Sequence, residues 1–318
     1  MITKKNIPIW KTAGKHESTY KTSYMKIINN FEKNCLKQFP NSTILFLDNT
    51  YSNGNEVLNI IAESNYNVVF IFSLVDPPYT WHYLKELCEK QFPKVKFIFI
   101  GNDAPDFNIP FGLLWSFDAF PKYSIQQVYP TNFNHVYLNY NGKKHEHRIR
   151  FAQKIKDNSL ESLGFFTLYS EEFQEQKHDF GLGNLDIWNS HFLNIVSETT
   201  FRIAPELLLS EKTFKPLVGL RPFIINGSPR YYTVLKELGF DCFDDIFPVE
   251  ELSKNELTVE ATMEKSHNII CNVIKELSQQ NLKEKYKELY PRLLKNREHF
   301  FNIGQQLTKI FCEEDLVF

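Results

Sequence analysis

Residues 210–227 read Ser-Glu-Lys-Thr-Phe-Lys-Pro-Leu-Val-Gly-Leu-Arg-Pro-Phe-Ile-Ile-Asn-Gly: a polar turn, a short helical stretch and an apolar strand. Ser210 stands where a helix N-cap is expected, with Glu211 and Lys212 in the first turn. The N–H groups of a first turn have no partner inside the helix and attract anions. The stretch therefore predicts a helix opening that binds phosphate with Lys212 and sugar hydroxyls with Glu211. An ordinary helix start with a Glu211–Lys215 ion pair is the alternative.

Apolar strands and amphipathic helices alternate on both sides of this stretch. Uninterrupted apolar runs predict strands at 43–47, 68–72, 95–100, 136–140, 163–168, 192–197 and 222–225. Helical spacing predicts helices at 24–39, 56–63, 81–91, 147–156 and 231–238, with further helices over 269–289 and 291–310. Residues 101–134 show no period and are predicted to be irregular. Continuous apolar strands between helices are typical of parallel sheets covered on both faces, so the fold class is α/β.

Composition restricts the class of protein. A chain of 318 residues, 42% hydrophobic and 23% charged, is typical of a globular protein with two domains. The net charge of −2 does not indicate a nucleic-acid binder. The five cysteines contain no CxxC pair, which argues against a zinc site or a disulfide framework. With no apolar run long enough to span a bilayer and no signal-peptide pattern, we expect a cytoplasmic location.

Residues 1–40 carry a local excess of lysine. Such an excess favours contact with a phosphate backbone or an acidic partner. The alternative is a solvated arm followed by an amphipathic helix.

Acidic residues follow three of the predicted strands, at Asp48, Asp76 and Asp103. Ligands of parallel α/β sheets bind beyond the carboxyl ends of the strands, so each of these residues is a candidate general base. Each is also a candidate turn-forming or capping residue.

A second anion-binding connection is predicted between the strand 136–140 and the helix that follows. Asn141 and Gly142 lie in the turn, and Arg148 lies near the start of the helix. Strand–turn–helix connections of this kind bind phosphate through backbone N–H groups, and an arginine adds a bidentate contact. A basic surface turn is the alternative.

Three segments together carry a resemblance to a known family, namely 137–151, 194–199 and 208–227. They resemble the donor-binding domain of GT-B glycosyltransferases, in particular fucosyltransferase-like enzymes and uncharacterised viral and phage glycosyltransferases. The resemblance implies that Arg148 and the loop with Asn141 bind the nucleotide pyrophosphate, and that Glu198 lies near the donor. It also implies that Ser210, Glu211 and Lys212 hold the ribose and the phosphates. The chain departs from the family pattern at two positions, where Leu208 replaces a tyrosine and Thr199 replaces an asparagine.

The resemblance also implies a domain organisation. Two Rossmann-like, doubly wound domains with C-terminal helices are expected in a GT-B-like architecture. Residues 1–134 would form the acceptor-side domain, 135–290 the donor domain, and 291–318 a C-terminal helix packing back on the first domain. The catalytic base would then come from the first domain, and Asp76 is the choice because it follows the strongest buried-strand pattern.

The function implied is transfer of a sugar from a nucleotide-diphosphate donor to an acceptor hydroxyl, with inversion and without metal or cofactor. The chain has no convincing DxD metal motif. One alternative is a phage-type DNA glycosyltransferase acting on a hydroxymethylated base, in which case the location would be the host cytoplasm. The other alternative is a nucleotide-binding module without catalytic activity.

Overall fold

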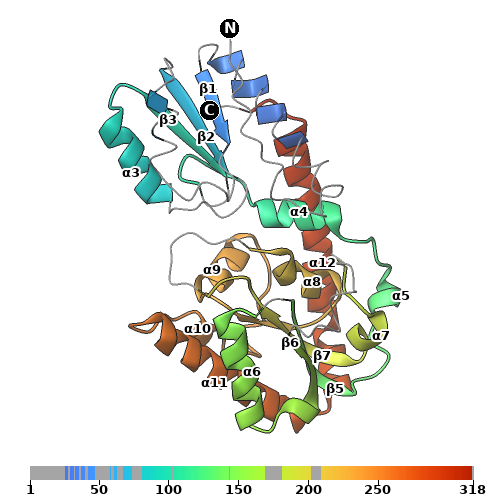
Figure 1. Cartoon of the computed structure of the whole chain (residues 1–318). Helices are drawn as coiled ribbons and strands as arrows, with labels where there is room; N and C mark the ends of the chain where they lie inside the picture. The colour runs from blue at the N-terminus through green and yellow to red at the C-terminus, as the bar shows by residue number, and fades with distance from the viewer. Residues whose placement is uncertain are drawn as a thin grey trace. The chain divides into compact units, whose positions relative to one another are not determined.

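The computed structural model describes residues 26–27, 29–31, 33–35, 37–39, 42–46, 58, 61–62, 67–73, 81–101, 104–142, 144–168, 181–201 and 209–316 (Figure 1). The backbone separates into two compact units. Unit 1 comprises Met1–Ala119, Glu206–Leu208 and Gly304–Phe318. Unit 2 comprises Phe120–Pro205 and Leu209–Ile303.

The described part of unit 1 contains a four-stranded parallel sheet. Its strands are β1 (Ser42–Phe46), β2 (Val68–Ser73), β3 (Lys96–Gly101) and the short β4 (Phe107–Asn108), in the order β1-β2-β3-β4. The helix α3 (Trp81–Gln91) leads into β3 and packs on it. The predicted strands at 43–47, 68–72 and 95–100 and the predicted helix at 81–91 are therefore confirmed.

Alternate side chains of these strands are buried on opposite faces of the unit 1 sheet. Phe70, Ile98 and Ile100 pack in one apolar cluster with Ile27, Phe31 and Cys35 of the N-terminal helical residues and with Phe311. Val69, Ile71 and Phe99 pack in a second cluster with Leu84 and Cys88 of α3. A strand that is buried on both faces explains the uninterrupted apolar runs in the sequence.

Two sequence-based expectations about helices are wrong. The segment 101–134, expected to be irregular, contains α4 (Phe111–Ala119) and α5 (Ile125–Val128). Most of α4 is apolar, and Leu113 and Leu114 are buried together with Ser116. A helix that is apolar on most of its surface lacks the alternation with polar residues that reveals a helix in a sequence.

The second wrong expectation is a helix that starts at Pro291. The helix α12 (Leu282–Cys312) is continuous, with Pro291 in its interior. An internal proline removes one helical hydrogen bond and costs about 3 kcal/mol or more. Tyr286, Leu289 and Leu293 are buried on both sides of it, and burial of each such side chain is worth about 1.5–3 kcal/mol. This continuous apolar stripe offsets the cost of the proline.

Unit 2 contains the second four-stranded parallel sheet. Its strands are β5 (His135–Asn141), β6 (Gly164–Leu168), β7 (His191–Ser197) and β8 (Phe223–Asn226). Their spatial order is β6-β5-β7-β8. The chain thus moves outward from β5 to β6 on one side and from β7 to β8 on the other. The neighbours β5 and β7 therefore flank a topological switch point, the place where parallel α/β sheets bind ligands.

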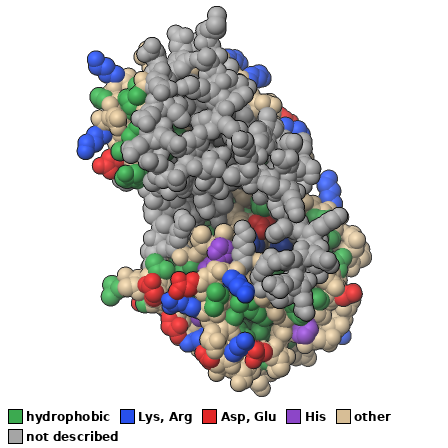
Figure 2. All heavy atoms as spheres, in the orientation of Figure 1, with side chains coloured by type: hydrophobic (Ala, Val, Ile, Leu, Met, Phe, Trp, Pro, Cys, Tyr) green, Lys and Arg blue, Asp and Glu red, His purple; other side chains and the backbone are tan. Residues whose placement is uncertain are grey.

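Helices cover the unit 2 sheet. Between its strands the chain forms α6 (Glu146–Asp157), a short 3-10 turn (Glu161–Leu163), α7 (Leu185–Trp188) and α8 (Glu211–Val218). Beyond β8 it forms α9 (Arg230–Glu237), α10 (Val249–Leu252), α11 (Val259–Ser278) and the first part of α12. The helix α11 packs against α6, β5 and β8, whereas α8 packs against β7. On the face of unit 2 seen in Figure 2, basic and acidic side chains are mixed rather than gathered by sign.

The structure thus confirms an α/β fold with Rossmann-like parallel sheets and long C-terminal helices. The GT-B arrangement and the boundaries at residues 134 and 290 remain predictions. Among the residues described, none of the helices combines the length and the apolar character needed to cross a membrane.

Candidate functional site

The candidate site lies at the carboxyl edge of the unit 2 sheet. The last residues of three neighbouring strands, Asn141 of β5, Ser197 of β7 and Asn226 of β8, are polar and buried there. Strands that run parallel end at the same edge, so these residues lie near the switch point between β5 and β7. The segments that follow β5 and β7 supply the remaining side chains of the site.

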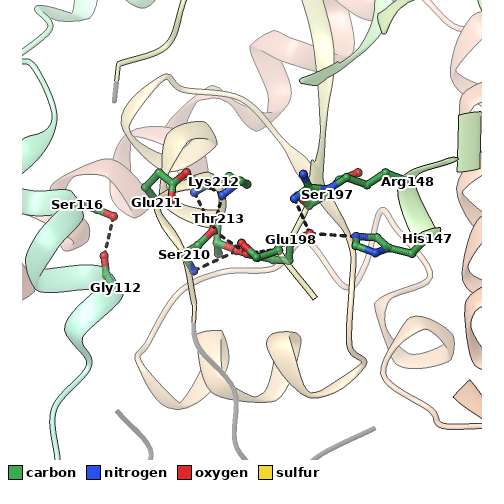
Figure 3. A network of polar contacts seen from close by, with 11 residues as sticks. Gly112, Ser116, His147, Arg148, Ser197, Glu198, Ser210, Glu211, Lys212 and Thr213 are labelled. Atoms are coloured by element: carbon green, nitrogen blue, oxygen red, sulfur yellow. Dashed lines mark hydrogen bonds and ion pairs between the residues drawn. The ribbon is translucent and has the colours of Figure 1, made fainter. Parts of the chain in front are cut away.

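Glu198, the residue after β7, has a fully buried carboxylate that accepts four hydrogen bonds (Figure 3). Oε1 accepts from the backbone N–H of Ser210 at 3.2 Å and from the hydroxyl of Thr213. Oε2 accepts from the hydroxyl of Ser210 at 2.6 Å and from the backbone N–H of Thr199 at 3.2 Å. The carboxylate is therefore fixed at the N-terminus of α8, where the helix dipole favours a negative charge.

The close packing around Glu198 requires a glycine at position 227. A Cβ atom at Gly227 would lie 2.8 Å from the ring of Tyr231 and 3.3 Å from the Cβ atom of Glu198. Only a hydrogen atom fits in this space.

Ser210 is the N-cap of α8, as the sequence predicts. Its backbone is extended, and its Oγ accepts from the N–H of Lys212 at 3.3 Å. The same hydroxyl donates to Glu198, so Ser210 links the end of β7 to the start of α8.

Glu211 and Lys212 form an ion pair in the first turn of α8, with 2.7 Å between Oε1 and Nζ. Their side chains are 18% and 27% exposed, so both reach solvent. Burial by itself raises the pKa of the Glu211 carboxyl, but Lys212, Lys215 and the hydrogen bond from Lys212 hold it below its usual value. Glu211 is therefore ionised at neutral pH and able to accept hydrogen bonds.

Arg148, in the first turn of α6, is buried, and its Nη2 donates to two backbone carbonyls. The acceptors are the oxygen of Ser197 at 2.9 Å and that of Glu198 at 2.7 Å. Burial lowers the pKa of the guanidinium, while the nearby charges of Glu198 and Glu211 favour its protonated form. Arg148 therefore holds the end of β7 and brings a positive charge close to both carboxylates.

His147, which precedes Arg148, makes a further contact to the same carbonyl. Its Nε2 lies 3.0 Å from the carbonyl oxygen of Glu198 (Figure 3). A carbonyl oxygen only accepts, so Nε2 carries the proton. Burial lowers the pKa of His147 to about 4, although the hydrogen bond to Glu198 opposes the shift, and the neighbouring Arg148 and His145 lower it further. The imidazole is neutral at pH 7.

Asn141 has its backbone N–H bonded to Oγ1 of Thr167 at 3.0 Å. Its side-chain amide nitrogen donates to Oδ1 of Asn139 at 2.5 Å. The backbone N–H of Asn141 and one N–H of its side-chain amide are therefore both bonded to protein acceptors.

The structure thus brings together five of the predicted site residues, Glu198, Ser210, Glu211, Lys212 and Arg148. Asn141 is joined to them through Asn139 and Ser197. The predicted base Asp76 and its alternatives Asp48 and Asp103 lie outside the described residues. Among the residues that are described, no three His, Cys, Asp or Glu side chains are grouped so as to hold a metal ion.

Several polar residues of this site were not predicted from the sequence, namely Asn139, His147, the hydroxyl of Ser197, Thr213, Asn226 and His267. Two of them carry a signal in the sequence. Asn139 and Asn141 lie two positions apart in an apolar strand, which places both side chains on one face. Thr213 lies three residues after the N-cap, on the same end of the helix.

The chain was compared with protein-family models, with curated proteins and with solved structures, and none of the three comparisons gives a match.

Proposed function

We propose that the chain transfers a sugar from a nucleotide-diphosphate donor to an acceptor hydroxyl, and that unit 2 binds the donor. The observation that carries this proposal is the gathering of Arg148, Glu198, Glu211 and Lys212 at the switch point of a parallel sheet. Sheets of this kind bind nucleotides beyond the carboxyl ends of their strands.

The start of α6 supports an anion site. The side chain of the N-cap residue His145 makes no capping hydrogen bond. Within the described part of the chain, the backbone N–H groups of Glu146 and His147 have no hydrogen-bond partner. Two such donors at the positive end of a helix dipole suit a phosphate group.

The start of α8 supports binding of the rest of the donor. Lys212 is partly exposed and able to turn from Glu211 toward a phosphate oxygen. The ionised carboxylate of Glu211 suits a pair of sugar hydroxyls. In the transfer, the bond from the sugar to the diphosphate breaks while the acceptor oxygen bonds to the same carbon. Lys212 and Arg148 would stabilise the charge of the departing diphosphate.

The acceptor hydroxyl must lose its proton during transfer. A base from the first domain, with Asp76 as the sequence-based choice, would accept this proton. Inversion, independence of metal and a GT-B arrangement of the two units are parts of this proposal.

A nucleotide-binding module without transfer is the second candidate. The observation that favours it is that the carboxylate of Glu198 already occupies the N-terminus of α8, and that Arg148 donates to backbone carbonyls. Both contacts fit a rigid binding site as well as a catalytic one.

A thermal-shift screen with UDP, GDP, ADP, CDP and their sugar conjugates tests donor binding. A ligand that binds only the folded state raises the free energy of unfolding, by about 2.7 kcal/mol when its concentration is a hundred times its Kd, and therefore raises the melting temperature. We expect one nucleotide to give a clear shift, and release of its diphosphate with a hydroxyl acceptor to establish transfer. A shift without release under any acceptor condition would favour the second candidate. No shift with any member of the panel would contradict both.

A further inference from the structure

A chain of buried polar side chains crosses the unit 2 sheet within the candidate site. It runs from His267 on α11 through Asn226, Ser197 and Asn139 to Asn141. Each of these five residues is at most 4% exposed. The contacts are 3.1 Å between His267 Nε2 and Asn226 Oδ1, and 3.3 Å and 3.0 Å from Ser197 Oγ to the amide nitrogens of Asn226 and Asn139.

The direction of the hydrogen bonds at the Asn141 end is fixed by a backbone group. The amide nitrogen of Asn139 lies 2.6 Å from the carbonyl oxygen of Ile195, which only accepts. Asn139 must therefore present its Oδ1 to Asn141. Asn141 must in turn present its nitrogen to Asn139, because a flipped amide would place two oxygen atoms 2.5 Å apart.

Asn141 Oδ1 is left as the free end of the chain. It is buried and has no hydrogen-bond partner in the described structure. Buried acceptors are paired in the great majority of cases, because an unpaired one loses its bond to water without compensation. An acceptor left unpaired at this position is suited to a donor that arrives with a ligand.

The position of this oxygen connects it with the proposed donor site. Asn141 ends β5 at the switch point, and the unpaired N–H groups of Glu146 and His147 begin α6 a few residues later. An acceptor and two donors are therefore supplied by one strand–turn–helix connection. A phosphate has only acceptor oxygens at neutral pH and suits the N–H groups, whereas Asn141 Oδ1 requires an O–H or N–H group.

We propose that Asn141 is a specificity-determining residue whose Oδ1 accepts a hydrogen bond from a hydroxyl of the bound nucleotide sugar, with Asn139 as the positioning residue that fixes its amide. This inference rests on the proposed function. The resemblance places Asn141 in a loop that binds the pyrophosphate, whereas the proposed contact is made by its side-chain oxygen, since its backbone N–H already donates to Thr167. The hydroxyl belongs either to the ribose or to the transferred sugar.

Calorimetric titration with deoxy analogues distinguishes these two sources. The probes are UDP, GDP, ADP and CDP, each with its 2′-deoxy and 3′-deoxy analogue, followed by the sugar conjugate of the nucleotide that binds and its single-deoxy sugar analogues. We expect the wild-type protein to bind one hydroxylated ligand about tenfold or more tightly than the analogue lacking that hydroxyl. In Asn141→Leu this preference should vanish. If the wild-type protein binds a deoxyribose analogue more weakly, the hydroxyl belongs to the ribose. If it binds a deoxy analogue of the transferred sugar more weakly, the hydroxyl belongs to that sugar.

Thr167→Val is the matched control. It removes the acceptor of the Asn141 backbone N–H but leaves the side-chain oxygen in place, so the preference should persist. If Asn141→Leu does not fold, as judged by circular dichroism, Asn141→Ala replaces it with the same expected loss.

Three other outcomes are decisive. Binding of a nucleotide or its sugar conjugate without any preference for a hydroxyl in the wild type overturns the role of Asn141 and leaves the proposed function standing. A preference that persists in the Asn141 variant does the same. Absence of binding by every nucleotide and sugar conjugate overturns the proposed function itself, and this inference with it.

Discussion

The carboxylate Oε2 of Glu198 and the hydroxyl of Ser210 are 2.6 Å apart, and their hydrogen bond joins the end of β7 to the start of α8. Each oxygen of Glu198 accepts one bond from a hydroxyl and one from a backbone N–H. A hydroxyl is able to rotate when its acceptor is lost, but a backbone N–H is not. The local structure therefore depends on two acceptor oxygens at this position.

Glu198→Gln is expected to destabilise the protein by about 2 kcal/mol, because the new amide nitrogen must face the backbone N–H of either Thr199 or Ser210. Urea unfolding at pH 7 measures the change. Glu284→Gln, at an exposed ion pair with Lys287, is the control and should stay within about 0.5 kcal/mol of the wild type. An equally small change for Glu198→Gln would mean that the carboxylate is not needed to hold the connection.

Acid should destabilise the folded protein through His147. Its folded pKa of about 4 is below the ordinary value of 6.5, so the unfolded chain binds more protons between these values and stability falls as the pH falls. From pH 7 to pH 5 the loss from this one group is about 2 kcal/mol. His147→Gln keeps a donor for the Glu198 carbonyl but does not titrate, so its stability should fall less over that range. Urea unfolding of both proteins at the two pH values gives the difference, and equal losses would contradict a buried neutral His147.

Most of the fold was predictable from the sequence because seven of the eight described strands are compact, mainly apolar runs, whereas the two-residue β4 lies in a segment that was expected to be irregular. The pairs Phe70–Ile98 and Val69–Phe99 show why, since alternate residues of these strands are buried on opposite faces of the sheet and are apolar on both. The helix α4 was not predictable by the same means, because it is apolar on most of its surface. At Pro291 the sequence predicted a helix start where the helix continues, because packing along α12 outweighs the local effect of the proline.

The candidate site was predictable only in part. Ser210, Glu211 and Lys212 are adjacent in the sequence, and local capping rules place them correctly. The contacts of Arg148 to the carbonyls of Ser197 and Glu198 depend on the neighbouring positions of β5 and β7, which only the strand order supplies. The network of His267, Asn226 and Asn139 likewise depends on contacts between distant segments.

Lys212→Ala and Arg148→Ala should differ in their effect on stability while both weaken binding of a nucleotide diphosphate. A charged contact to phosphate is worth about 1.5–3 kcal/mol, so each variant should lose about ten- to a hundredfold in affinity. Lys212 is partly exposed, and its removal should leave the melting temperature nearly unchanged. Arg148 is buried, and its removal takes the guanidinium donor from the carbonyls of Ser197 and Glu198, of which the second keeps His147 as a donor, so the loss should be about 2 kcal/mol.

Titration calorimetry and urea unfolding measure the two quantities. Lys287→Ala, which removes an exposed lysine paired with Glu284, is the control for both and should change neither. Full affinity in Lys212→Ala and Arg148→Ala alike would contradict the proposed diphosphate site.

Transfer should continue in the presence of EDTA. The positive charges of Lys212 and Arg148, together with the first-turn N–H groups of α6, are proposed to stabilise the diphosphate in place of a divalent cation. The measurement compares initial rates with EDTA, with added Mg²⁺ and with added Mn²⁺. A complete loss of transfer in EDTA that added metal restores would show that the donor binds as a metal complex.

Asp76→Asn should abolish or severely reduce transfer while donor affinity stays within a few fold of the wild type. A positioned general base contributes about 10²–10⁴ in rate, which is far outside assay scatter. The substitution removes the ability to take up a proton but keeps the size of the side chain.

If Asp76 instead stabilises the turn before Pro77 and Pro78, the variant should lose stability and keep its turnover when assayed in the cold. The base would then be sought at Asp48 or Asp103. Loss of donor binding together with transfer would place Asp76 in the donor site and would contradict the division of roles between the two domains. Rates, calorimetric affinities and melting temperatures of the one variant therefore separate a catalytic base, a turn residue and a donor-binding residue.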